Sequence, residues 1–332
     1  LWETEAGKDY EHLLEPFKGH TPLPVQKWLA DRGHITDTYL PIIAGESFTP
    51  KPVQVSNEAP PVGEPINVLH SGDLGDLIHG MAVFKGMGKV NLYFLDRGIT
   101  KRIIERLPLI TDLLKSQPYI NECKPHENER IDWNASDFRH NHEITKSLAR
   151  AHFDHMRSTL KKHIPFDLRS PWITGITSDP RAAGKIVVAR SPRYQNHYFR
   201  WGKVVEHFGK DRLLFVGLPE EHANFTRAYG DVTFVPTKNL LEVAGLIKGS
   251  DIFIGNQSCS FAIAEGLKHP RIQETDLTFP DCVFPTAEGY AKAQHVDHQI
   301  VIPKRRAAIT NDDLVVTCLF ELVNYVNHLR RT

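Results

Sequence analysis

Residues 251–274 read DIFIGNQSCSFAIAEGLKHPRIQE, and this stretch decides the fold class. It opens with a short apolar strand at 252–254, which Gly255 and Asn256 end. A small polar run, QSCS, follows, and we expect a helix to begin near Phe261. The first N–H groups of a helix have no partner inside it, and the helix dipole favours negative charge there. A strand that turns into a helix in this way is a candidate anion site, although most such units hold no ligand.

The composition is that of an ordinary globular protein. The chain has 332 residues, of which 41% are hydrophobic and 24% charged, and this length allows two domains. A formal net charge of zero argues against a large nucleic-acid surface but leaves room for a local basic groove. The four cysteines form no CxxC pair, which argues against a zinc knuckle and favours a reducing, cytoplasmic setting. We expect neither a membrane span nor a signal peptide.

The first part of the chain predicts an extension followed by an α/β unit. Residues 1–62 form the extension and linker, since 47–65 carry five prolines. From residue 63 to about 170 a βαβα rhythm is typical of a parallel sheet wrapped by helices. We expect strands at 66–69 and 90–95, a helix ending near Met87, and two successive helices at 99–107 and 109–116.

Residues 123–163 are polar and rich in histidine. We expect one helix within 143–162, with an apolar side made of Ile144, Leu148, Ala151 and Met156. The histidines of this region include His140, His142, His152 and His155. The HxH pair has no third ligand at a suitable spacing, so we interpret these histidines as solvated or packing residues and predict no metal site.

A second α/β unit is expected over residues 171–310. Its strands are predicted at 186–189, 212–216, 232–235 and 252–254, and a further strand at 299–302. Helices are expected at 202–208, from the turn at 217–221 to about 229, and at 240–248. Residues 311–332 predict a last helix with an apolar stripe, free to cross back onto the first half.

Two stretches resemble one family. SGDLGDLIHG at 71–80 is similar to the amino-terminal loop of the heptosyltransferases (glycosyltransferase family nine), a glycine-aspartate pair followed by a hydrophobic pair and a histidine. GNQSCSFAIAEGL at 255–267 resembles that family's carboxy-terminal GNDSGPMHLAAAL. Gln257, Cys259 and Ala262 depart from the family residues, which indicates a divergent branch. Together the two loops, in the right order and βα context, are moderately specific.

The resemblance implies a GT-B fold, in which two Rossmann-like domains face each other across a cleft. It implies a glycosyltransferase that moves a sugar from a nucleotide-diphosphate sugar to an acceptor hydroxyl. Such enzymes also occur in bacteriophages, so the acceptor stays open between a saccharide and a modified DNA base. Ligands of open α/β sheets gather at the carboxyl ends of strands, where both loops are expected.

On the acceptor side, the resemblance makes Asp76 the general base, with Asp73 as the alternative. An aspartate at this place can also cap the following helix. Gly72 and Gly75 would permit close approach of substrate to the backbone, and His79 completes the loop motif.

On the donor side, the polar turn and the loop after the strand at 186–189 supply the candidates. The expected donor-binding residues are Arg190, Arg193, Arg200, Glu221 (or Glu220), Asn256, Gln257, Ser258, Cys259, Ser260 and Glu265. Arginine chelates phosphate oxygens, and a carboxylate accepts both hydroxyls of a ribose. Beyond GDLGD no DxD pair lies at a strand end, so a metal-independent, inverting mechanism without cofactor is expected.

Two other functions fit the same residues. One is a non-catalytic relative that binds a nucleotide or glycan, and the other is a sugar-nucleotide epimerase of the same fold.

Overall fold

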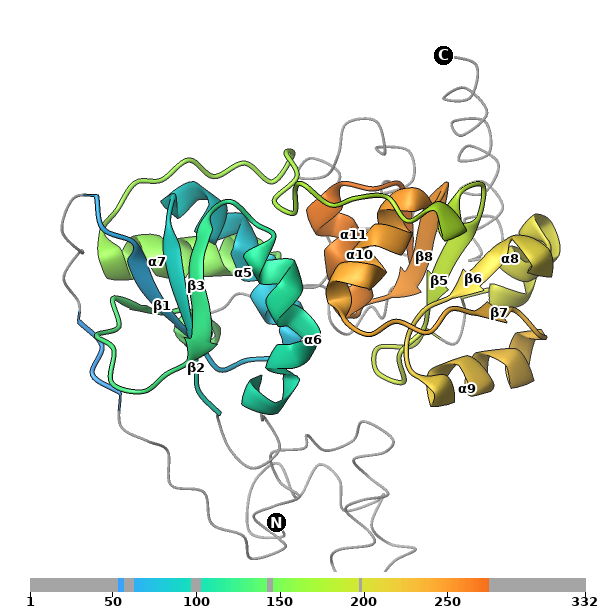
Figure 1. Cartoon of the computed structure of the whole chain (residues 1–332), viewed down its shortest axis with the longest axis horizontal. Helices are drawn as coiled ribbons and strands as arrows, with labels where there is room; N and C mark the ends of the chain where they lie inside the picture. Colours follow the sequence, from blue (N-terminus) through green and yellow to red (C-terminus); the bar gives the residue numbers. More distant parts are fainter. Residues whose placement is uncertain (1–52, 57–62, 97–102, 142–145, 197–198, 275–332) are drawn as a thin grey trace, which may run out of the picture.

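The computed structural model describes residues 53–56, 63–96, 103–141, 146–196 and 199–274, which form two α/β halves side by side (Figure 1). The expected strand at 299–302, the last helix at 311–332 and nearly all of the extension at 1–62 lie outside these residues. Each half contains one parallel sheet, so the predicted α/β class is confirmed.

The first sheet has the order β3-β2-β1-β4, with all of its pairs parallel. Its strands are β1 Ile66–His70, β2 Val90–Phe94, β3 Ile120–Pro125 and β4 Trp133–Asn134. The helices of this half are α5 Leu74–Met87, α6 Ile103–Lys115, the 3-10 helix η2 Ala135–Asn141 and α7 Leu148–Leu160. The sequence did not predict β3 or β4, and β3 is an edge strand whose mixed polar residues carry no clear alternation.

Helix α6 corrects one prediction. The sequence suggested two helices around Pro108, but over Ile103–Lys115 the helix continues through this proline. A proline inside a helix removes one backbone hydrogen bond. Here the buried face compensates, because Leu107, Ile110 and Leu113 on either side of the proline are in the core.

The second sheet has the order β7-β6-β5-β8-β9, again with parallel pairs. Its strands are β5 Ile186–Ala189, β6 Leu213–Phe215, β7 Thr233–Phe234, β8 Ile252–Asn256 and β9 Arg271–Glu274. The helices are η3 Pro180–Ala182, α8 Trp201–Phe208, η4 Lys210–Arg212, α9 Pro219–Tyr229, α10 Leu240–Gly249 and α11 Cys259–Leu267. The strands predicted in this half within the described residues are confirmed, and β9 is an addition.

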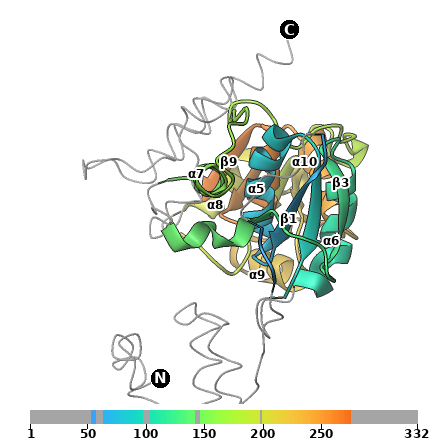
Figure 2. The same ribbon diagram turned by 90° about the vertical axis from the view of Figure 1, so that its left-hand side faces the viewer.

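The two halves pack against each other through helices. α5 contacts α11 and α6 contacts α10, as Figure 1 shows between the two sheets. Figure 2 views the same arrangement with the first half nearest the viewer. One apolar cluster contains residues of both sheets and of these four helices. Outside this cluster, the Asn239 side-chain amide of the second half donates a hydrogen bond of 2.7 Å to the Asp112 carboxylate of the first half.

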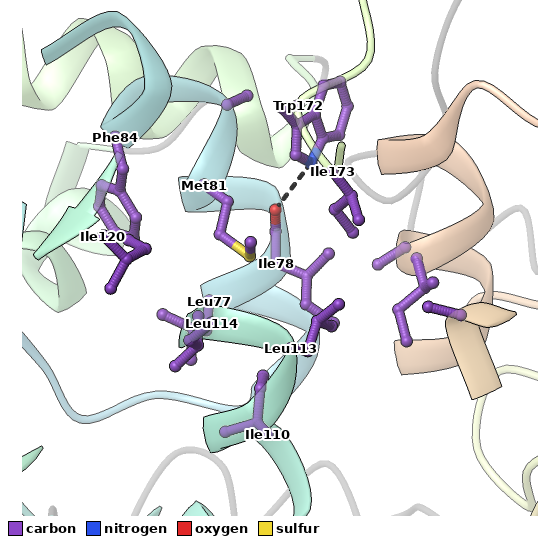
Figure 3. Packing of buried hydrophobic residues seen from close by; sticks show 14 of the residues in the cluster. Leu77, Ile78, Met81, Phe84, Ile110, Leu113, Leu114, Ile120, Trp172 and Ile173 are labelled. Carbon is purple, nitrogen blue, oxygen red and sulfur yellow. Dashed lines mark hydrogen bonds between the residues drawn. The ribbon is translucent and has the colours of Figure 1, made fainter. Parts of the chain in front are cut away.

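The segment between the halves is fixed by Trp172, which is 1% exposed. Its Nε1–H donates to the Ile78 carbonyl of α5 at 3.0 Å (Figure 3). The backbone N–H groups of Trp172 and Ile173 both donate to the Gly266 carbonyl of α11, at 2.9 and 3.0 Å. The connecting segment is therefore part of the core between α5 and α11.

Among the described helices, none combines the length and the apolar character that crossing a membrane would require.

Candidate functional site

The two loops singled out in the sequence lie together. Asp73 precedes α5 at the end of β1, and Arg193 lies in the loop after β5 of the other half. The Asp73 carboxylate and the Arg193 guanidinium are 3.6 Å apart. Burial and, to a smaller degree, the charge of Asp73 raise the pKa of the Cys259 thiol, at the start of α11, to about 12. The carboxyl ends of β1, β5 and β8 therefore meet at one place between the halves.

Asp76 lies in the first turn of α5 and is 7% exposed. Its two carboxylate oxygens accept hydrogen bonds from Arg139 Nη2, each at 2.8 Å, and Arg139 Nε adds a third at 3.3 Å. The N-cap position itself belongs to Asp73, which makes no side-chain capping bond. Asp76 is thus an almost buried anion, stabilised by one arginine and by the helix dipole.

His70 shapes the backbone in front of Asp76. Its Nδ1 accepts from the Gly72 N–H at 3.2 Å, so the ring is neutral with its proton on Nε2, and Ser71 N–H donates to the Ser136 hydroxyl at 2.7 Å. Burial lowers the pKa of His70 to about 4, against the opposing charge of Asp76. A Cβ at Gly72 would lie 3.2 Å from His70 Cε1 and 3.3 Å from Asp76 Oδ2, so a side chain there would crowd both.

Gly75 and His79, the other two residues expected on the acceptor side, do not take part in the contacts described for Gly72. A Cβ at Gly75 would have no heavy atom within 4 Å, so nothing in the described structure requires glycine there. His79 is 5% exposed and lies on the buried side of α5. Its surroundings include Glu265, whose pKa is lowered by Arg271 and Lys268 and, to a smaller degree, by His79.

On the donor side, Asn256 organises the loop after β5. It is completely buried, accepts from Ser191 N–H at 3.0 Å and donates from Nδ2 to the Ser191 carbonyl at 3.0 Å. The same amide nitrogen also donates to the Arg193 carbonyl. Asn256 therefore joins the loop after β5 to the loop after β8, which places Arg193 near the start of α11.

The start of α11 is polar. Ser258 is the N-cap residue, and its hydroxyl caps no backbone N–H of the helix. The Oγ atom is buried and has no hydrogen-bond partner within the described part of the chain. Cys259 and Ser260 are half-buried, and Gln257 is 4% exposed. The first N–H groups of this helix and an unsatisfied hydroxyl thus gather beside Asp73.

The three arginines expected at the phosphate are placed differently from one another. Arg190 donates to both oxygens of Glu274, each at 2.8 Å, and this carboxylate also accepts from Trp201 Nε1 at 2.8 Å. Arg200 is the N-cap residue of α8 and is exposed. The Arg193 guanidinium faces Asp73 in the loop of the first half, and 59% of the Arg193 side chain is exposed.

The carboxylates expected at the ribose are held locally. Glu221 accepts from the Leu218 N–H at 2.8 Å at the start of α9, and burial raises its pKa. Glu220 is exposed. Glu265 is completely buried and pairs with Lys268 and Arg271. The structure therefore does not bring Glu221 and Glu265 into the group formed by Asp73, Asp76, Arg193 and Ser258.

Sequence reasoning missed Arg139 and Glu274. Arg139 lies in η2, 63 residues from its partner Asp76, and no local pattern connects the two. Glu274 ends β9, a strand that was not predicted. The sequence alone gives no signal for either of these pairings.

Within the residues that the structure describes, no group of three or more histidine, cysteine or acidic side chains could hold a metal ion. His155, one of the histidines considered as a ligand, accepts from Trp133 Nε1 at 3.0 Å, and His152 is buried against Phe138 with ring centroids 3.9 Å apart. These two are therefore packing residues.

No protein-family model and no curated protein matches this sequence. Solved structures do match the fold. A family 9 glycosyl transferase from Veillonella parvula DSM 2008 has a TM-score of 0.52 at 11% identity, covering 81% of this chain and 100% of that one. E. coli ADP-heptose LPS heptosyltransferase II gives 0.49 at 10% identity, covering 79% and 99%. E. coli heptosyltransferase WaaC with ADP gives 0.45 at 11% identity, covering 63% and 87%. The chain has the two-domain GT-B fold of the family 9 glycosyltransferases, and the resemblance carried by the two loops is confirmed at the level of that fold.

Proposed function

We propose that this protein is a glycosyltransferase that moves a sugar from a nucleoside-diphosphate sugar to an acceptor hydroxyl. One observation carries the proposal: an aspartate loop of the first half and a helix N-terminus with an arginine of the second half meet between two Rossmann-like sheets. Ligands of such sheets bind at the carboxyl ends of the strands, where this group lies.

The donor's diphosphate would bind at the start of α11. The free N–H groups of the helix and the unsatisfied Ser258 hydroxyl are donors for phosphate oxygens, and Arg193 supplies positive charge. These groups would stabilise the negative charge that develops on the leaving diphosphate, which is the part a metal ion plays in other enzymes. The reaction in this proposal is metal-independent.

Asp76 is the proposed general base. It would accept the proton of the acceptor hydroxyl while the acceptor oxygen bonds to the anomeric carbon and the bond to the diphosphate breaks on the opposite face, which inverts the configuration. Because Arg139 bonds both carboxylate oxygens, the acceptor hydroxyl must either share one of these oxygens with the arginine or displace one of these bonds. Arg139 is 46% exposed on its side chain, so it has room to move toward solvent.

The ion pair between Asp76 and Arg139 favours a second candidate function, a protein that binds a nucleotide or glycan without catalysing a reaction. Such a protein needs no accessible base, and Asp76 is almost buried under Arg139.

The two candidates are separated by measuring sugar transfer and donor hydrolysis with a panel of nucleotide sugars. For the enzyme, Asp76→Asn should lose about 10²- to 10⁴-fold in rate while nucleoside-diphosphate binding persists. Asp154→Asn, which removes a carboxylate 3.4 Å from Lys146 at the surface of the first half, is the matched control and should leave the rate unchanged. Full activity of Asp76→Asn would exclude this residue as the base. Binding without turnover of any donor by the wild type would support the second candidate.

A further inference from the structure

The contact between Asp73 and Arg193 joins the two halves beside the proposed donor site. The two side chains are 3.6 Å apart, with 30% and 59% of their surfaces exposed. On its other side, the Asp73 carboxylate lies 3.7 Å from Arg106 of α6. Asp73 therefore stands between one arginine of its own half and one of the opposite half.

Asp73 also lies near the start of α11. Its negative charge contributes to the raised pKa of Cys259, the first residue of that helix. The neighbouring Ser258 hydroxyl, buried and without a partner in the described residues, is a further polar group at this point. A carboxylate next to a guanidinium and a helix N-terminus makes the interactions that a phosphate would make there.

We propose that Asp73 sets the affinity of this protein for its donor, because its carboxylate occupies the phosphate's place beside Arg193 until a bound diphosphate takes over that guanidinium. This inference rests on the proposed function. A diphosphate at the start of α11 would meet the charge of Asp73, and like charges at short distance repel. The exchange moves Asp73 away from Arg193 and leaves it with Arg106, so the carboxylate keeps a cationic partner in its own half.

The packing of the halves limits this exchange to side chains. α5 and α11 share one apolar cluster, and the Trp172 segment is bonded to both helices. Separating the halves would expose that cluster to water, whereas both Asp73 and Arg193 are partly exposed and can change partners without it.

The experiment measures the dissociation constants of ADP, GDP and UDP by calorimetry, for the wild type and for Asp73→Asn. Removal of a competing, partly exposed ion pair should tighten binding by at least about threefold, and the gain should shrink at high salt. Asp112→Asn is the matched control, because it removes the charge of a carboxylate in another contact between the halves, the one with Asn239, which involves neither Asp73 nor Arg193. It should leave the dissociation constants unchanged.

A double-mutant cycle identifies Arg193 as the group in competition. In an Arg193→Ala background, Asp73→Asn should give a smaller gain, since no guanidinium remains to be released. An unchanged or weaker affinity of Asp73→Asn, or an equal gain from Asp112→Asn, would overturn the proposal for Asp73 while leaving the proposed function standing. If neither the wild type nor Asp73→Asn binds any of the three nucleotides, the proposed function itself fails.

Discussion

Replacing Glu265 by glutamine should strongly destabilise the fold. Glu265, Lys268 and Arg271 are 0%, 3% and 1% exposed, and the carboxylate pairs with both cations. Burial alone would raise the pKa of Glu265, but Arg271 and Lys268 hold it below its ordinary value. Without the carboxylate, Lys268 still has the face of Trp172, 4.5 Å from its Nζ, and Arg271 still has the His269 carbonyl at 3.1 Å, but neither of these contacts neutralises a buried positive charge.

The magnitude follows from the two cations left in the core. Breaking a buried ion pair by removing one partner costs about 3–5 kcal/mol, a large part of the roughly 5–15 kcal/mol by which a domain is stable. Urea denaturation measures it, because urea is uncharged and does not screen ion pairs. We expect the unfolding midpoint to fall by about 1 M or more for a typical slope of about 1–3 kcal/mol per M.

A matched control uses the same substitution on the surface. Glu206 pairs with Lys203 at 2.8 Å, but 69% of its side chain is exposed, so Glu206→Gln should leave the midpoint unchanged. Replacing all three buried charges by methionine should restore much of the stability. If Glu265→Gln lowers the free energy of unfolding by less than about 1 kcal/mol, the reasoning is refuted, because two buried cations that lose their carboxylate should destabilise the fold by more than that.

Three further predictions concern other parts of the core. The pKa of His70 falls from 6.5 to about 4 on folding, so with respect to this residue the protein is most stable above pH 6.5, where the imidazole is neutral in both states, and loses stability as the pH falls toward 4. The free energy of unfolding should decrease by about 2 kcal/mol between pH 7 and pH 5. In urea titrations, His70→Asn should reduce this dependence of the unfolding free energy on pH. A Cβ at Gly86 would lie 2.0 Å from the Pro165 carbonyl oxygen, so Gly86→Ala should lower the free energy of unfolding by about 1–3 kcal/mol. A Cβ at Gly202 in α8 would meet nothing within 4 Å, so Gly202→Ala is the control and should be neutral or stabilising by up to about 1 kcal/mol. Equal melting temperatures of the two variants would contradict this prediction. Because burial raises the pKa of Cys259 from 9.0 to about 12, iodoacetamide at pH 8 should label it about a hundredfold or more slowly than in urea, as peptide mass spectrometry can test.

The elements that the sequence predicted correctly are those with strong local signals. β5 and the first three residues of β8 are continuous apolar runs, although β8 extends through Gly255 and Asn256, which were expected to end it. The helices α8 and α11 begin within two residues of their expected starts. The boundary around Pro108 was wrong because tertiary burial of α6 outweighs one lost backbone bond. β9 was missed because RIQE is short and polar, and only its pairing with β8 makes it a strand.

For the candidate site, the sequence located the loops but not the partners of their residues. The family resemblance identified Asp76 and the start of α11, which are local motifs. The bonds from Arg139 to Asp76 and from Arg190 to Glu274 join positions 63 and 84 residues apart, so they depend on how the sheets place the strand ends. Such pairings leave no signature in a single sequence.

The Trp172 segment has a consequence for how the protein unfolds. One apolar cluster continues from the first sheet to the second, with Trp172 bonded to both α5 and α11, so the two halves share the part of the core that lies between their sheets. Thermal denaturation should therefore show a single cooperative transition for both halves, and a fragment cut after α7 should aggregate because its α5 face would be bare.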